Sequence, residues 1–154
     1  MRVLRGPRTV LQEGFPPMAV FASSDDLYKV FAPYFEKLAA DPQIGPKFVS
    51  ANTAFRVNYS EPEASFALDA RQDPPRVLSG DEAAAHDVEV ELAMSADEGH
   101  RFWLGKVNMP VALARRKVVV TGPIAKLLGI LPALQPAFAI YRDHLAEVGH
   151  GEPA

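Results

Sequence analysis

Four histidines are the first side chains in this sequence that could bind a metal or move a proton: His86, His100, His144 and His150. None of them forms a His-x-His or His-x-x-x-His pair, so the spacing predicts no metal site. Asp143 and His144 are adjacent, and adjacent residues on a helix point apart. We expect His100, with Glu98 and Arg101 nearby, to lie on a solvated helix face.

Carboxylates are the second source of chemistry, because a buried carboxylate has a raised pKa and can abstract a proton. The candidates lie in segments that alternate like strands: Asp69, Asp87, Glu89 and Glu91. Nothing in the sequence places one of them in a cavity. The chain has no cysteine, no Gly-x-Ser-x-Gly elbow, no phosphate loop and no dinucleotide motif. We therefore expect no catalytic residue, no cofactor and no enzyme activity.

The basic cluster Arg115-Arg116-Lys117 is the most suggestive charge feature. It could meet an anionic head group or a membrane surface, but a solvated turn before a strand is the favoured interpretation. The chain as a whole is acidic, with 19 acids, 16 bases and a net charge of -3, so no nucleic-acid partner is expected. The lack of cysteine fits a reducing compartment, and we expect a cytoplasmic protein.

Hydrophobic spacing predicts the elements that must position these residues. A cap signal at residues 23–26 precedes an apolar helical stripe of residues 27–38, which Pro33 should kink or restart. The period at which apolar residues recur then changes from 3.6 to 2. This alternation, in residues 55–59 and 66–68, predicts two antiparallel strands. Val77 and Leu78 could add a short third strand, followed by a loop or one helical turn.

The second half begins with the clearest strand, residues 87–95. A capping box of Ser95 and Glu98 predicts a short helix to Leu104, and Pro110 can open a further turn. Another strand follows at residues 117–121. The apolar residues 122–141 are long enough to span a bilayer, but they contain a lysine, a glutamine and three prolines and so predict two short helices. Five apolar residues that are spaced four, three, four and three apart form a further helical stripe, from Leu134 to Val148.

This order of elements predicts an α+β fold, in which a mostly antiparallel sheet is covered on one face by helices. The length of 154 residues suits one domain. We expect an N-terminal arm at residues 1–22 without a signal peptide, one domain at residues 23–148, and a disordered tail at residues 149–154.

Residues 87–122, DVEVELAMSADEGHRFWLGKVNMPVALARRKVVVTG, resemble the signature stretch of the sterol carrier protein type 2 family. In that family an alternating strand ends in a helix cap, a short bulky helix and a Gly-Lys-Leu-Asn-Pro-like turn follow, and a strand ends in glycine. Here Ser95 is the cap and Gly122 ends the strand. Two departures are Arg116, where the family usually has glycine, and Met109, which separates the turn asparagine from Pro110.

The resemblance implies a five-stranded sheet under helices, with an apolar tunnel between the two layers. Known family members bind sterols, fatty acids, acyl-CoA or phospholipids, and the family domain has no catalytic residues to carry over. The sequence itself does not show a cavity, and for any one apolar helical residue core packing is the simpler interpretation. Candidate ligand-binding wall residues lie on the helical segments: Phe102, Trp103, Val107, Met109, Leu113, Leu127, Leu128, Leu131, Leu134, Phe138 and Tyr141.

Three functions remain open at this stage. The first is a carrier that binds a lipid-like ligand in the cavity for lipid transport or presentation, with exchange through opening of residues 124–148. The second is an accessory protein-interaction module, as in isoprenoid-quinone biosynthesis factors that share the fold. The third, against the expectation above, is an enzyme acting on a hydrophobic small molecule, which would need a buried carboxylate or histidine at a pocket, and the sequence offers only weak candidates for one. A homodimer, a protein partner and transient contact with a membrane surface also stay open.

Overall fold

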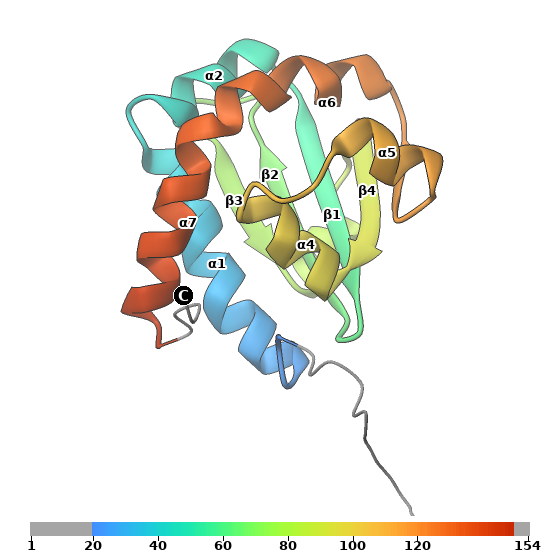
Figure 1. Ribbon diagram of the computed structural model, residues 1–154. Helices are drawn as coiled ribbons and strands as arrows, with labels where there is room; N and C mark the ends of the chain where they lie inside the picture. The colour runs from blue at the N-terminus through green and yellow to red at the C-terminus, as the bar shows by residue number, and fades with distance from the viewer. Residues whose placement is uncertain (1–19, 150–154) are drawn as a thin grey trace, which may run out of the picture.

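The computed structural model describes residues 20–149, which form one five-stranded sheet with helices layered mainly over one face (Figure 1). The predicted α+β class is therefore confirmed. The elements are α1 (Ser24–Ala40), α2 (Ile44–Ala51), β1 (Ala54–Ser60), β2 (Ala64–Asp69), β3 (Arg76–Ser79), α3 (Asp81–Ala85), β4 (Val90–Ser95), α4 (Ala96–Trp103), α5 (Met109–Ala114), β5 (Val118–Thr121), α6 (Ile124–Ile130), the 3-10 turn η2 (Leu131–Leu134) and α7 (Gln135–Glu147).

The strands lie in the order β3-β2-β1-β4-β5. Three of the four neighbouring pairs are antiparallel, and β1 and β4 are parallel. Val57 in the central strand β1 stands opposite Phe66 on one side and Leu92 on the other. Because side chains alternate across a sheet, these three residues share the face that the helices cover.

Helix α1 begins as its cap signal predicts, with the Ser23 side chain accepting a hydrogen bond from the Asp26 amide at 3.1 Å. The helix continues through Pro33 instead of restarting there. Proline has no amide hydrogen to donate to the carbonyl four residues earlier, that of Lys29. Both Pro33 and Lys29 are on the exposed side of the helix, so this carbonyl faces water rather than the core.

Helix α2 is absent from the sequence-based expectation, and it contains Gly45 and Pro46, two residue types that disfavour a helix interior. Both lie in its first turn, where the backbone amides have no intrahelical acceptor in any case. The carboxylate of Asp41 accepts from the amides of Gln43 and Ile44 at 2.9 and 2.8 Å and supplies the missing cap. The helix brings Phe48 into the core, at 7% exposure.

The segment that resembles the family signature folds in the predicted order. Ser95 caps α4 by accepting from the Glu98 amide at 3.0 Å, and Gly105 ends it with φ of 79°. Asn108 caps α5 in the same way, through Val111. Arg116 adopts a left-handed φ of 58°, the conformation for which the family's usual glycine is suited.

Arg116→Gly is accordingly expected to stabilise the protein by about 0.5–1 kcal/mol, because glycine lacks the Cβ that is strained at positive φ. Urea denaturation of the two proteins measures the difference in unfolding free energy. Arg115→Gly, at a neighbouring exposed position without positive φ, should instead be neutral or destabilising. Equal stability changes in the two variants would contradict the strain argument.

His100 is buried, at 3% exposure, so the prediction of a solvated position was wrong. Its Nδ1 lies 2.8 Å from the Tyr141 hydroxyl, and its ring meets the edge of Phe21. The reason is helical phase: Ala96, His100 and Trp103 are spaced four and three apart and share the buried side of α4.

His144 is also buried, at 1% exposure, at the contact between α7 and α1. Its Nε2 donates to the carbonyl of Val30 at 2.6 Å, and its Nδ1 has no hydrogen-bond partner. Burial lowers the pKa of His144, and the bond to Val30 offsets only part of that effect. Lys37 also lowers the pKa and Glu147 raises it.

The folded protein therefore favours neutral His144, whereas the unfolded chain takes up the proton near the ordinary pKa of about 6.5. Stability should be lost as the pH falls through that value toward the lower folded pKa. We expect the urea midpoint to fall between about pH 7 and pH 5, and to fall less steeply in His144→Gln. Equal slopes for the two proteins would show that another group carries the dependence.

Among the described residues, one helical segment, Ile124–Glu147, is long and apolar enough to cross a membrane by length and composition alone. In this structure it is α6, η2 and α7 in succession, as the prolines predict. Its apolar stripe faces the core, where Leu127, Ile130 and Leu134 are at most 6% exposed. These three side chains are covered by the fold, whereas 28% of the most apolar window of the segment is buried in all.

Two segments at the ends of the chain bear on the domain boundaries. Most of the predicted arm and tail, and with them His150, lie outside the described residues. Val20 and Phe21 are described: the amide of Val20 donates to Asp97 at 3.1 Å, and the Phe21 ring lies 5.4 Å from that of Phe31. The chain therefore contacts the core of the domain before residue 23.

Candidate functional site

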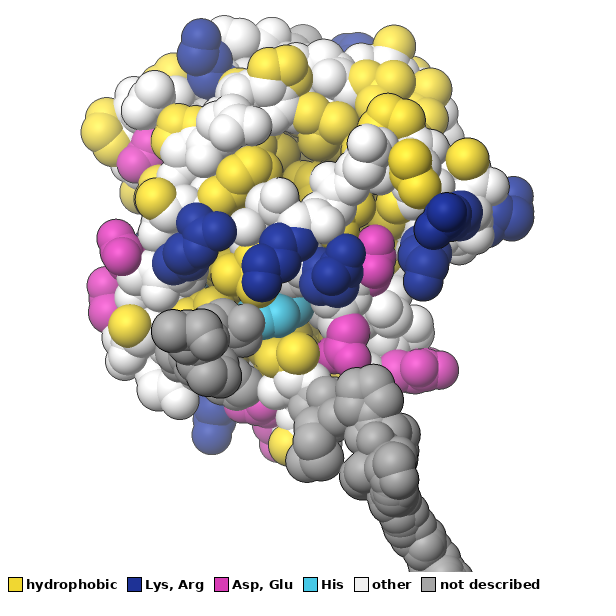
Figure 2. Space-filling model, in the orientation of Figure 1, with side chains coloured by type: hydrophobic (Ala, Val, Ile, Leu, Met, Phe, Trp, Pro, Cys, Tyr) yellow, Lys and Arg dark blue, Asp and Glu magenta, His cyan; other side chains and the backbone are white. Residues whose placement is uncertain are grey.

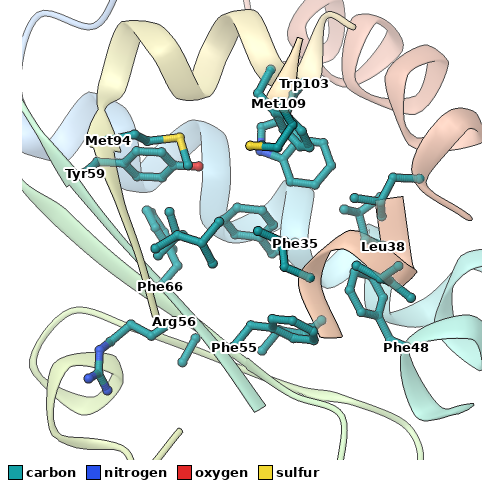
Figure 3. Close-up of a pocket in the computed structure, with 18 residues that line it drawn as sticks. Phe35, Leu38, Phe48, Phe55, Arg56, Tyr59, Phe66, Met94, Trp103 and Met109 are labelled. Carbon is teal, nitrogen blue, oxygen red and sulfur yellow. The ribbon is translucent and has the colours of Figure 1, made fainter. Parts of the chain in front are cut away.

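An apolar cavity of about 100 Å³ lies between the sheet and the helices. In Figure 2, apolar side chains are visible in the hollow between the α6–α7 segment and α4–α5. Figure 3 shows the cavity from within. Its lining residues come from both layers of the fold: Phe35, Leu38, Phe48, Phe55, Arg56, Val57, Tyr59, Phe66, Ala67, Leu68, Leu92, Met94, Phe102, Trp103, Met109, Leu127, Ile130 and Leu134.

The floor of the cavity is the covered face of the sheet. Phe55, Val57 and Tyr59 alternate along β1, and Phe66 and Leu68 alternate along β2. Strand β4 adds two more lining residues with the same period. The antiparallel register of β1 and β2 places Val57 beside Phe66, near the middle of this floor.

The roof is made by helices from distant parts of the chain. Helix α1 contributes Phe35 and Leu38 from its apolar stripe, and α2 contributes Phe48. Trp103 ends α4, and Met109 begins α5. Helices α6 and η2 close the roof with three aliphatic side chains that recur every three to four residues: Leu127, Ile130 and Leu134.

Few polar atoms reach the cavity. The indole nitrogen of Trp103 faces the hydroxyl of Tyr59 (Figure 3), and burial raises the pKa of Tyr59 while the nearby indole offsets part of the shift. The guanidinium of Arg56 points away from the cavity and pairs with Glu91 at 3.0 Å. The lining thus offers a ligand an apolar surface with hardly any hydrogen-bonding groups.

The carboxylates considered for acid-base chemistry lie outside the cavity lining. Arg71 holds the pKa of Asp69 well below its usual range by hydrogen bonding, and His86 adds a contact at 2.8 Å. Hydrogen bonding by Asn58 lowers the pKa of Glu91. Both groups are stabilised as carboxylates, which is the opposite of a proton-abstracting carboxyl in an apolar site.

The carboxylates of Asp87 and Glu89 also lie outside the cavity lining. The side chain of Asp87 is 97% exposed, and that of Glu89 accepts from the Ala54 amide at 3.2 Å. Within residues 20–149, no group of three or more His, Asp or Glu side chains is arranged to hold a metal ion.

The structure places five of the eleven predicted wall residues in the cavity lining: Phe102, Trp103, Met109, Leu127 and Leu134. Val107, Leu113, Leu131 and Phe138 are partly buried and pack against the core beside it. Tyr141 is fully buried against Phe31 and His100, and Leu128 is 42% exposed on the outside of α6. Their contact with a ligand stays a prediction that the lining of this structure does not support.

The sequence-based list missed the floor and much of the roof. The signal was present in the alternating apolar residues of β1, β2 and β4, whose dry face was assigned to the core. A sequence pattern identifies which face is buried, but not whether the space above that face is filled. Phe48 was missed together with α2.

No protein-family model matches this sequence, and no curated protein matches it. Several solved structures are similar to this chain. Sterol carrier protein 2 from Yarrowia lipolytica is 22% identical with a TM-score of 0.54, over 73% of this chain and 91% of that one. The sterol carrier protein domain 2 of Helicoverpa armigera is 15% identical with a TM-score of 0.57, over 72% and 89%.

A third similar structure is the stereoselective inverting sec-alkylsulfatase of a Pseudomonas species, 15% identical with a TM-score of 0.52 over 65% of this chain. The match covers only 15% of that enzyme. Together these comparisons confirm the sterol carrier protein 2 fold that the sequence resemblance predicts. The same fold stands alone in some proteins and forms a small part of an enzyme in another, so the fold does not by itself assign the activity.

Proposed function

We propose that this protein, which has the sterol carrier protein 2 fold, binds one lipid-like molecule in the apolar cavity and carries or presents it. The observation that supports this most is the lining itself, in which side chains from both layers converge on a space without a carboxylate or a histidine. Such a lining recognises an apolar body by excluding water from it.

The expected affinity follows from the length of chain that is buried. Each buried methylene contributes about 0.8 kcal/mol, so about fourteen contribute about 11 kcal/mol. Association costs of about 4 kcal/mol leave about 7 kcal/mol, or a Kd on the order of 10 μM at the tightest, because enlarging the cavity costs further free energy. An acyl chain or a fused-ring ligand of similar apolar area fits this range.

Binding requires the cavity to expand. About 100 Å³ is smaller than an engineered cavity of about 150 Å³ that admits benzene, and ligand sites usually enclose at least about 300 Å³. Met109 can change rotamer at low cost, because its side chain is unbranched. Outward movement of α6 and η2 would withdraw Leu127, Ile130 and Leu134 together, so we propose that ligands exchange through the segment of residues 124–148.

A carrier role is favoured over a catalytic one by the chemistry of the lining. A reaction needs a group that can give or accept a proton, attack a bond or hold a metal at the ligand. The polar side chains nearest the cavity are Tyr59, whose pKa is raised, and the indole of Trp103. Neither is activated by a neighbouring base in the lining.

Native mass spectrometry tests the proposal, using purified protein mixed in turn with palmitate, cholesterol and a ubiquinone. We expect saturable one-to-one adducts with at least one of these probes, released as free ligand by organic extraction. If no probe gives an adduct, the carrier function is wrong, and the accessory interaction module becomes the better hypothesis.

A further inference from the structure

The charges of this chain are distributed unevenly along the sequence. Residues 99–142 contain no Asp or Glu, although the chain has 19 acids and a net charge of -3. The same stretch carries seven bases: Arg101, Lys106, Arg115, Arg116, Lys117, Lys126 and Arg142. This acid-free stretch includes the end of α4, all of α5, β5, α6 and η2, and the first half of α7.

The middle of this stretch, residues 109–130, lies toward the right in Figure 1, whereas α7 lies at the left. It supplies one edge of the sheet, β5, and the part of the roof made by α5 and α6. Arg115, Arg116 and Lys117 are all exposed there, in the turn between α5 and β5. In Figure 2, Lys and Arg side chains form a row across the molecule, and the right-hand end of the row lies below the apolar side chains of the α5 and α6 region, whereas acidic side chains lie mostly in the lower half and at the left edge.

Exposed apolar side chains gather on the same side. Five large hydrophobic residues are exposed within residues 20–149, and three of them belong to α5 and α6: Val111, Ile124 and Leu128, at 40–43% exposure. Ile124 and Leu128 are four residues apart in α6 and therefore share one side of that helix. We call the surface formed by these three residues and by Arg115, Arg116 and Lys117 the basic-apolar face.

We infer that the basic-apolar face docks on the surface of an anionic lipid bilayer. Each exposed base near such a surface is attracted to it, and the apolar side chains between the bases can enter the head-group boundary. A nucleic acid would use the bases but not the apolar side chains. This inference does not require the cavity to be filled, so it stands or falls separately from the proposed function.

Docking would also place the roof of the cavity at the lipid surface. Leu127 and Leu128 are adjacent on α6: Leu127 lines the cavity, and Leu128 belongs to the basic-apolar face. A shift of α6 toward the lipid would therefore open the roof on the side from which a lipid would enter.

Sedimentation with vesicles tests the inference, comparing pure phosphatidylcholine with vesicles that hold about 30% phosphatidylglycerol. We expect binding only to the anionic vesicles, and loss of that binding in high salt. One base near the surface accounts for about a fivefold change in partitioning, so Arg115→Gln with Lys117→Gln should weaken it about 30-fold.

The matched control is Lys29→Gln with Arg76→Gln, which removes the same charge from α1 and from β3, the opposite edge of the sheet. It should change partitioning by less than about twofold. Leu128→Ser should weaken binding about fivefold, and Val148→Ser, at a similarly exposed position outside the face, should not. Circular dichroism establishes that all variants are folded.

Three outcomes would overturn the inference. Equal binding to neutral and anionic vesicles would remove the role of the bases. An equal effect of the two double variants would show that net charge, and not this face, is responsible. A concentration-dependent dimer that Leu128→Ser abolishes, without vesicle binding by the original protein, would assign the face to a second copy of the chain.

Discussion

Val57→Phe is expected to abolish measurable ligand binding while leaving the protein folded. Val57 lies near the middle of the cavity floor and is only partly buried, because the space above it is not filled. A phenyl ring at this position occupies the volume that a ligand needs. The ligand must then displace it, at a cost of about 2–3 kcal/mol, which corresponds to about 30- to 150-fold weaker binding.

The matched control is Val119→Phe, the same substitution on β5 at an exposed position outside the lining. The dissociation constant of palmitate from Val119→Phe should stay within about twofold of that from the unsubstituted protein. Adduct formation with palmitate in native mass spectrometry measures both variants, and thermal melting measures their stability. Retained binding in a folded Val57→Phe protein would mean that the ligand occupies another place.

Gly122→Ala is expected to destabilise the fold by about 3 kcal/mol or more. Gly122 has a φ of 102°, and a Cβ at this position would lie 2.1 Å from the carbonyl oxygen of Glu89. Strands β4 and β5 must therefore separate to admit a methyl group. Urea denaturation should show an earlier midpoint.

Gly129→Ala is the same substitution at another position, and it is expected to have the opposite effect on the stability of the fold. Gly129 lies in α6, and a Cβ there meets no atom within 4 Å. Alanine favours the helix and restricts the unfolded chain, so we expect stabilisation of about 0.5–1 kcal/mol. If both alanine variants shifted stability in the same direction, the close approach at Gly122 would not be the cause.

Most of the fold could be predicted because its local signals agree with its packing. The Ser23 and Ser95 caps, the alternating strands and the glycine that ends β5 each lie where the sequence predicts. Helix α2 could not be predicted in the same way, since its cap is the carboxylate of Asp41 and its first turn holds Gly45 and Pro46. The parallel pairing of β1 with β4 joins residues that are far apart in the sequence, so no short sequence pattern predicts it.

The candidate site was less accessible to sequence reasoning. Helical stripes placed Leu127, Leu128 and Leu134 among the candidate wall residues; Leu127 and Leu134 line the cavity, whereas Leu128 faces outward by helical phase. His100 was misjudged because polar neighbours suggested solvent, whereas its partner Tyr141 is far away in the sequence. A cavity depends on side chains from many elements failing to fill one space, which only the three-dimensional structure reveals.

Quenching of Trp103 fluorescence tests the central claim most directly, because Trp103 is the only tryptophan in the chain and lines the cavity. A fatty acid brominated in the middle of its chain quenches an indole only on contact. We predict saturable one-to-one quenching that is lost in Val57→Phe and kept in Val119→Phe. No quenching, or equal and unsaturable quenching in all three proteins, would contradict ligand binding in this cavity.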